Sequence, residues 1–437
     1  MIKRFKNKLS TDVHFSELFH GSSIAFFMHL IGLVLGYIFT LLIARWYGAD
    51  TMGLYALSLT LLNIFVTIGT FGFGSALVKF IADYNYNDKP YLAKEIYKKV
   101  ITFVVPLGLL LSLLFYIFTE YLALEVFDNS KLIPYFHITV FGVLPFILLT
   151  INTAFFRGVK NIKLFAFLDK VAIFIFTPIL LAIAYYGLNW EGIATIISRV
   201  IAILLLLIMS YVALRRYHYI FRSSVQKLLS YRDIFRVSLP MLLTNSLVLV
   251  MSWTDILMLG IFTDEAEVGI YNVVIKLAML TTITLMAMNT IAGPKFSELY
   301  SRGDMQGLKK VAQNATRMVF YSSLPIIIIL ILFAKHILGI FGQEFTVGVY
   351  ALWILVIGRF INVCSGSVTV LLNMTGKQVP LNVVMLIASI LNVVLNYFLI
   401  PIYGIEGAAI ATAISLAFNR IVPVILVRRY YGFFMLI

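Results

Sequence analysis

Seven charged residues lie inside long apolar runs of the sequence, where a charge normally needs a partner or a ligand. Five are basic and two are acidic: Lys170, Arg199, Lys276, Arg359, Arg420, Asp169 and Asp255. This excess of positive charge favours an anionic ligand, and arginine can donate two parallel hydrogen bonds to one phosphate group. A diphosphate headgroup is the kind of ligand that these residues would attract.

Three of the arginines are candidates for binding such a ligand. Arg359 and Arg420 each lie about thirteen residues into an apolar run, which places them near the middle of a membrane at about 1.5 Å per helical residue. Arg359 could instead bind backbone carbonyls of a neighbouring helix, and Arg420 could extend towards the cytoplasm. Arg199 lies nearer the outer end of its run and could instead pair with acidic residues of the outer loops.

Asp255 and Lys276 lie at similar depth near the outer ends of two consecutive runs. They could form a structural ion pair. Alternatively, Asp255 could take up and release a proton or a sodium ion, which would make it the candidate for ion coupling. Asp169 and Lys170 are expected to be a pair at the cytoplasmic edge of the membrane, on different faces of their helix.

Polar residues of two further regions are also candidates. Asn382, Asn392 and Asn396 fall on related faces of one predicted helix, where they could hydrogen-bond sugar hydroxyls or hold helices together. Arg45 ends the first apolar run, where it could contact the ligand or anchor the helix at the membrane interface.

The composition excludes a water-soluble globular protein. Of the 437 residues, 61% are hydrophobic and 12% are charged, and the mean hydropathy is +0.97. A typical soluble protein has about 25% charged residues. The single cysteine, Cys364, excludes a disulfide framework. We therefore predict an all-α polytopic membrane protein.

Apolar runs of about twenty residues predict twelve membrane-spanning helices. Their approximate ranges are 22–44, 54–78, 100–119, 132–155, 164–186, 191–214, 236–261, 268–292, 317–334, 346–371, 380–401 and 407–427. This division predicts an N-terminal six-helix bundle at 1–214, a cytoplasmic linker at 215–235 and a C-terminal six-helix bundle at 236–437.

The basic residues are distributed unevenly over alternate loops. One side of the membrane holds 26 of the 34 Lys and Arg residues, whereas the other holds three basic and ten acidic residues. Because basic loops stay in the cytoplasm, both termini are predicted to be cytoplasmic. The net charge of +14 thus reflects topology, and we expect no nucleic-acid partner.

The sequence has no feature that indicates catalysis. No GxxxxGK[ST] phosphate-binding loop and no cluster of metal-ligating residues is present, and the predicted outer loops are no longer than about fifteen residues. We predict that the protein is not an enzyme and that it needs no cofactor apart from a coupling proton or sodium ion.

The two halves of the chain are related by an internal repeat. A shift of 216 positions aligns Gly53-Leu54-Tyr55 with Gly269-Ile270-Tyr271, and the match continues without gaps to Lys79 and Lys295 and beyond. Because each half has six predicted spans, the two bundles should be related by a pseudo-two-fold axis along the membrane normal. This arrangement favours a transporter with its site between two bundles.

Two stretches resemble a known family of transporters. The segment from Ala44 to Leu57, ARWYGADTMGLYAL, resembles the first outer loop of Wzx-type polysaccharide-repeat flippases, and the segment from Leu395 to Ser415 is similar to their junction between spans 11 and 12. These flippases belong to the multidrug/oligosaccharidyl-lipid/polysaccharide exporter superfamily, whose fold is called MATE-like.

The resemblance implies a flippase for an isoprenoid-diphosphate-linked oligosaccharide, such as an undecaprenyl-diphosphate-linked O-antigen unit, in a bacterial plasma membrane. It also implies membrane lipids and a glycan polymerase as partners. The alternative is a cation-coupled multidrug exporter of the same superfamily. Drug exporters usually carry an ion-binding acid in span 1, and residues Ser22 to Ala44 contain none.

Overall fold

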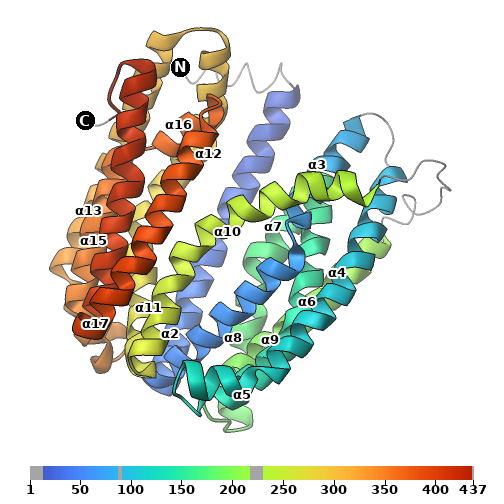
Figure 1. Cartoon of the computed structure of the whole chain (residues 1–437), viewed down its shortest axis with the longest axis vertical. Coiled ribbons are helices and arrows are strands. Elements are labelled where there is room, and N and C mark those ends of the chain that lie inside the picture. Colours follow the sequence, from blue (N-terminus) through green and yellow to red (C-terminus); the bar gives the residue numbers. More distant parts are fainter. Residues whose placement is uncertain (1–12, 87–90, 217–229, 436–437) are drawn as a thin grey trace. The chain divides into compact units, whose positions relative to one another are not determined.

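The computed structural model describes residues 13–86, 91–216 and 230–435. Within these ranges all regular elements are helices (Figure 1). The four predicted cytoplasmic bases of the N-terminus and most of the predicted linker at 215–235 lie outside the described residues. The helical multi-span fold that the sequence predicts is confirmed.

Nine helices among the described residues are long and apolar enough to cross a membrane. Helices satisfy their own backbone hydrogen bonds, which a lipid environment requires. Two of the nine contain a break at a glycine in a left-handed conformation, Gly48 at φ 82° and Gly404 at φ 52°. The number of twelve spans stays a prediction: it is reached if both broken helices are counted twice and the helix Tyr231–Phe262 is added.

The chain divides into two units. The N-terminal unit contains residues 1–42 and 61–245, and the C-terminal unit contains residues 43–60 and 246–437. Two long helices, α2 (Val13–Thr70) and α10 (Tyr231–Phe262), therefore contribute to both units.

The remaining helices of the N-terminal unit follow one another along the chain. They are α3 (Phe73–Tyr86), α4 (Tyr91–Ile117), α5 (Thr119–Tyr121), η1 (Leu122–Val126), α6 (Leu132–Gly158), α7 (Ile162–Ala166), η2 (Phe167–Val171), α8 (Ala172–Gly187) and α9 (Ala194–Arg215). Buried polar groups join three of them: the Tyr97 hydroxyl donates to Asn152 Oδ1 at 2.7 Å, and Asn152 Nδ2 donates to Ser210 Oγ at 2.9 Å.

The remaining helices of the C-terminal unit end with the longest red helix of Figure 1. They are α11 (Glu265–Met279), η4 (Leu280–Thr282), α12 (Ile283–Ser301), α13 (Met305–Leu332), α14 (Ala334–Phe341), η5 (Gln343–Gly348), α15 (Val349–Ser365), α16 (Val368–Met374) and α17 (Gln378–Tyr431). Asp264 caps the start of α11, because its carboxylate accepts the Glu267 backbone N–H at 2.8 Å.

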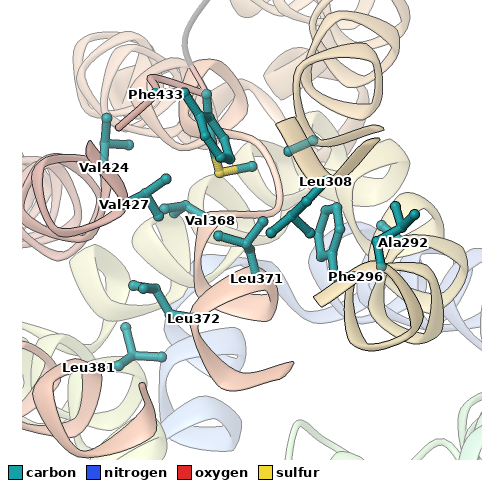
Figure 2. Close-up of a cluster of buried hydrophobic side chains, with 13 residues drawn as sticks. Ala292, Phe296, Leu308, Val368, Leu371, Leu372, Leu381, Val424, Val427 and Phe433 are labelled. Carbon is teal, nitrogen blue, oxygen red and sulfur yellow. The ribbon is translucent and has the colours of Figure 1, made fainter. Parts of the chain in front are cut away.

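A buried apolar cluster holds α12, α13, α16 and α17 together (Figure 2). Phe296, Leu308 and Leu371 are fully buried in it. Phe433 and Met435, which follow α17, fold back into the same cluster. The end of α17 is therefore fixed by packing.

The repeat-related glycines Gly53 and Gly269 lie where α2 and α11 cross within the C-terminal unit. A Cβ on Gly269 would lie 2.0 Å from the Ala49 carbonyl oxygen, and one on Gly53 would lie 1.7 Å from the Glu265 carbonyl oxygen. Neither position can hold a larger residue without separating the helices. The repeat detected in the sequence thus corresponds to a close crossing of equivalent segments, and this crossing places Tyr271 two residues further along α11.

Candidate functional site

Asp255, in the C-terminal part of α10, lies at the centre of a buried polar cluster in the C-terminal unit. Its side chain is 2% exposed. Asn396 Nδ2 and Asn392 Nδ2 donate to Oδ1 at 2.7 Å and 3.2 Å. The Tyr271 hydroxyl donates to Oδ2 at 3.1 Å, and the Thr412 hydroxyl donates to the same oxygen. Each carboxylate oxygen therefore accepts hydrogen bonds from two neutral donors.

The break in α17 is what brings two parts of this helix to one carboxylate. Asn392 and Asn396 are one turn apart before the break at Gly404, whereas Thr412 follows it. Asn392 Nδ2 also donates to Thr412 Oγ1 at 3.2 Å, which joins the two parts directly. The amide nitrogen atoms of both asparagines thus donate hydrogen bonds within the Asp255 cluster. Contact of these asparagines with a sugar stays a prediction.

The cluster is rich in oxygen atoms that could bind a small hard cation. The Oδ1 atoms of Asn392 and Asn396 are buried without a hydrogen-bond partner in the described structure. Rotation of each amide would turn this oxygen towards Asp255, beside the Thr412 and Tyr271 hydroxyls. Carboxylate, amide and hydroxyl oxygens are suitable ligands for hard cations. With one negative charge from Asp255, the arrangement suits a proton or a monovalent cation.

A pair of arginines lies in the same unit. Arg359 is on α15 and Arg420 is on α17, and these two helices pack along each other. Arg420 Nη1 donates to Thr369 Oγ1 on α16 at 3.3 Å, and its Nε atom is buried without an acceptor in the described structure. The structure therefore brings together two arginines that the sequence singled out separately.

Arg199, on α9, is the corresponding buried base of the N-terminal unit. It is 7% exposed, and its guanidinium lies over the ring of Phe174 on α8 at 5.5 Å from the ring centre. Its Nε and Nη1 atoms have no acceptor among the described residues. These donors could bind an anion.

Three further candidates from the sequence analysis are Arg45, Lys276 and Asn382. Arg45 donates to the backbone carbonyls of Gly339 and Ile340, so its guanidinium joins α2 to α14. Lys276 is half-buried in the last turn of α11, and Asn382 is half-buried near the start of α17. An ion pair between Lys276 and Asp255 stays a prediction.

Asp169 and Lys170 form an ion pair with 2.8 Å between Lys170 Nζ and Asp169 Oδ2. The sequence predicted these two residues as a pair, and the ion pair forms although they are adjacent in the chain. They belong to η2, a turn of π-helix whose geometry departs from that of an α-helix.

Tyr271 and Thr412 are members of the Asp255 cluster that the sequence analysis did not predict. Tyr271 belongs to the repeated Gly-x-Tyr segment, and Thr412 belongs to the second stretch that carries the family resemblance. Both signals were present in the sequence. Neither indicates that these side chains meet Asp255, because the contacts depend on how the consecutive helices α10 and α11 pack against α17, which is distant along the chain.

A multi-span helical fold that encloses a buried acid and a buried arginine is typical of a membrane transporter. The family model described as "Polysaccharide biosynthesis protein" matches residues 18–300, and the MatE model matches residues 240–398. The chain belongs to the polysaccharide biosynthesis protein family. The resemblance found in the sequence is thereby confirmed.

Three curated proteins from archaea are similar to this chain. The probable low-salt glycan biosynthesis flippase Agl15 of Haloferax volcanii is 32% identical over 39% of this chain and 36% of its own length. The probable flippase AglR of the same organism is 26% identical over 40% of this chain and 37% of its length. The match thus spans little more than a third of each flippase. An uncharacterized membrane protein of Methanocaldococcus jannaschii is 22% identical over 83% of this chain and 74% of its length.

Solved structures with a similar fold are transporters of the MOP superfamily. An inward-facing multidrug resistance MATE family transporter has a TM-score of 0.76, with 14% identity over 93% of this chain and 98% of the other. A MOP superfamily transporter from Pyrococcus furiosus has a TM-score of 0.63, with 15% identity over 94% of this chain and 95% of the other. These similarities confirm the MATE-like fold.

Proposed function

We propose that the protein is a flippase for an isoprenoid-diphosphate-linked oligosaccharide. It moves this lipid from the cytoplasmic to the outer leaflet by alternating access, for the assembly of a surface polysaccharide. Membership of the polysaccharide biosynthesis protein family and the similarity to two proteins described as probable flippases support this proposal. The protein transports its substrate and does not act as an enzyme.

The observation that carries the proposal is the pair of arginines on α15 and α17. Burying a charge in a membrane protein costs several kcal/mol, and placing two like charges on helices that pack along each other adds repulsion. A diphosphate offsets both costs, because its oxygens accept hydrogen bonds from both guanidinium groups. In the proposed function Arg359 and Arg420 bind the diphosphate. Arg199 and Lys276 are further candidates for contact with the anion, and Asn382 is a candidate for contact with the sugar.

The energy source in this proposal is a cation gradient acting on Asp255. Binding of a proton or a sodium ion neutralises the carboxylate and changes how strongly its four donors are held. Because these donors lie on α11 and on both parts of α17, the charge of one residue affects the packing of several helices. This role follows from the oxygen-rich surroundings of Asp255.

The proposed location is a bacterial plasma membrane, with both termini in the cytoplasm. The proposed partners are an undecaprenyl-diphosphate-like carrier, membrane lipids and a glycan polymerase. The location and the partners follow from the resemblance to Wzx-type flippases, and the orientation follows from the distribution of basic residues over the loops.

The proposal is tested by deleting the gene and analysing the extracted lipids by mass spectrometry. We expect isoprenoid-diphosphate oligosaccharides to accumulate while the surface glycan decreases, and the mass of the lipid would identify its sugars. The wild-type gene should reverse both effects, whereas Arg359→Gln and Arg420→Gln variants present at normal amounts should not.

Arg302→Gln is the matched control, because Arg302 is exposed and pairs with Glu298 at 3.0 Å outside the proposed site. This variant should restore export. Unchanged lipids and glycan after deletion, in a host without a second flippase, would contradict the proposal and favour a multidrug exporter. Normal export by the Arg359→Gln variant would remove Arg359 from the mechanism.

A further inference from the structure

Helix α11 contacts the break of α17 through Glu267. A Cβ on Gly404 would lie 2.7 Å from Glu267 Oε2 and 3.4 Å from Glu267 Oε1, so the carboxylate lies directly against the backbone at the break. The Ile405 backbone N–H, which directly follows the break, donates a hydrogen bond to this carboxylate. A helix leaves its first N–H groups without an intrahelical acceptor, and a carboxylate is a strong acceptor for them. Glu267 therefore caps the second part of α17.

The other broken helix has the same arrangement at Gly48, in the part of α2 that belongs to the C-terminal unit. The backbone N–H of the next residue, Ala49, donates to Glu344 Oε1 at 2.8 Å, and a Cβ on Gly48 would lie 3.2 Å from that oxygen. At both breaks a left-handed glycine is thus followed by an N–H group that a distant glutamate accepts. Only the break in α17 separates donors to Asp255, because α2 contributes none of the four donors described above.

The capped break lies midway between donors to Asp255 that are far apart along α17. Asn396 lies eight residues before Gly404, and Thr412 lies eight residues after it. Because eight helical residues span about 12 Å, a change of about 20° in the angle of the break moves one donor by about 4 Å. The hydrogen bond from Asn396 to Asp255, at 2.7 Å, does not survive such a movement. The angle of the break therefore decides whether Asp255 keeps donors from both parts of α17.

Helix α11 contacts both the break and the acid. Glu267 and Tyr271 are one turn apart, which places them on the same face of the helix. The Tyr271 hydroxyl donates to Asp255 Oδ2 at 3.1 Å, so one turn of α11 contacts the acid and the preceding turn contacts the break. The start of α11 is itself fixed, because Asp264 Oδ1 accepts the Glu267 backbone N–H at 2.8 Å. Helix α11 thus sets the position of the break relative to the acid.

We propose that Glu267 is a positioning residue of the Asp255 site. By capping the second part of α17 it fixes the angle of the break, and this angle holds the two asparagines and Thr412 around the carboxylate. Without the cap the two parts of α17 can change their angle, and Asp255 loses hydrogen bonds that stabilise its charged form. This inference rests on the proposed function, because it takes Asp255 as the residue that binds the coupling cation. It does not depend on which lipid is transported.

The test measures the protonation of Asp255 by infrared spectroscopy of the purified full-length protein in lipid vesicles. The carbonyl band of the protonated acid is assigned by its loss in Asp255→Asn and is followed as a function of pH in sodium-free buffer. We expect Glu267→Ala to move the midpoint of this titration to higher pH by about one unit or more, because donors that favour the charged form are lost. Glu267→Met, which keeps the length of the side chain but has no carboxylate, should move the midpoint in the same direction.

Glu267→Gln separates the hydrogen bond of Glu267 from its charge. The amide oxygen can accept the Ile405 N–H, whereas the negative charge is lost, so the midpoint should stay the same or move slightly to lower pH. Glu344→Ala is the matched control, because it removes the cap at Gly48 and leaves the break of α17 intact. Its midpoint should equal that of the wild type. Thermal unfolding in the same buffer verifies that each variant is folded, and Glu267→Met replaces Glu267→Ala if the latter is not.

The possible failures can be told apart. Equal midpoints for Glu267→Gln and for the two variants without an acceptor would overturn the positioning role, including the case in which none of them titrates. A similar shift in Glu344→Ala would also overturn it, since the effect would then not arise at the break of α17. If deletion of the gene leaves lipids and glycan unchanged while Glu267→Ala still shifts the midpoint, the proposed cargo fails and the positioning role stands.

Discussion

The two units of the protein each bury a charged side chain within a long helix, but they surround it differently. Asp255 in the C-terminal unit receives two donors at each carboxylate oxygen. Arg199 in the N-terminal unit lies against the ring of Phe174, and two of its nitrogen atoms have no acceptor in the described structure. The surroundings of Asp255 are preorganised for a change of charge, whereas Arg199 has donors available for a ligand.

Because of this difference, substitutions of Asp255 and of Arg199 should affect thermal stability and transport differently. Removal of the acid should affect both, because the donors around it would lose their acceptor. Removal of Arg199 should affect transport alone, because few protein contacts depend on its hydrogen bonds. Four predictions test this comparison, in order of decreasing expected effect.

The largest effect is expected for Asp255→Ala. Transport should fall by at least about 100-fold, and thermal stability should fall because each buried donor left unsatisfied costs about 1–3 kcal/mol. Asp255→Asn should lose transport but keep most of the stability, since the amide preserves the shape of the side chain. Accumulated lipid-linked glycan measures transport, and thermal unfolding in detergent measures stability. Normal transport by Asp255→Ala would remove the acid from the mechanism.

A strong effect on stability is also expected for Gly269→Ala. Its Cβ would lie 2.0 Å from the Ala49 carbonyl oxygen, so α2 and α11 would have to separate, at a cost of about 2–4 kcal/mol. Gly187→Ala is the matched control, because nothing lies within 4 Å of its Cβ position. Melting temperatures of the two variants should differ clearly. Equal melting temperatures would show that the crossing is not close in the protein.

An intermediate effect is expected for Arg199→Met. Transport should fall by about 10-fold, while thermal stability should stay the same or rise, because replacing a buried, poorly satisfied charge by an apolar chain is often stabilising. Both quantities are measured as for Asp255. A marked loss of stability would mean that Arg199 serves mainly as packing against Phe174, and the contrast between the two units would then disappear.

The smallest effect is expected for Thr412→Val. Asp255 would lose one of its four donors, so the apparent affinity for the coupling cation should change by about 3-fold to 10-fold. Ser415→Ala is the matched control, since Ser415 lies on the same part of α17 and its buried hydroxyl bonds to no acceptor in the described structure. The cation dependence of transport in vesicles distinguishes the two. Identical cation dependence in both variants would exclude Thr412 from the site.

The helical fold and the main candidate residues could be predicted from the sequence because the membrane imposes simple rules. Apolar runs long enough to cross a bilayer form helices, and a charge inside such a run needs a partner or a ligand. These rules identified Asp255, Arg359 and Arg420 individually. Comparison of the two halves of the sequence identified the repeat, whose glycines Gly53 and Gly269 meet at a helix crossing.

The grouping of these residues could not be predicted, because it depends on helix breaks and on packing over long sequence distances. Asn392 and Asn396 were candidates for contact with a sugar, yet the break at Gly404 turns α17 so that these residues and Thr412 meet one carboxylate. Periodicity along a helix indicates which side chains share a face. It does not indicate which other helix that face contacts.

The sequence by itself determined that this protein is a helical membrane protein of two related halves, because hydropathy and charge act locally along the chain. It also singled out the charges that lie inside the apolar runs. The tertiary structure decided that the acid is surrounded by neutral donors and that two arginines lie together, because these contacts arise only where α10, α11, α15 and α17 pack. Helix packing is set by the shapes of whole surfaces, and small residues such as Gly358 allow the close approach that brings Arg359 beside the Asp255 cluster.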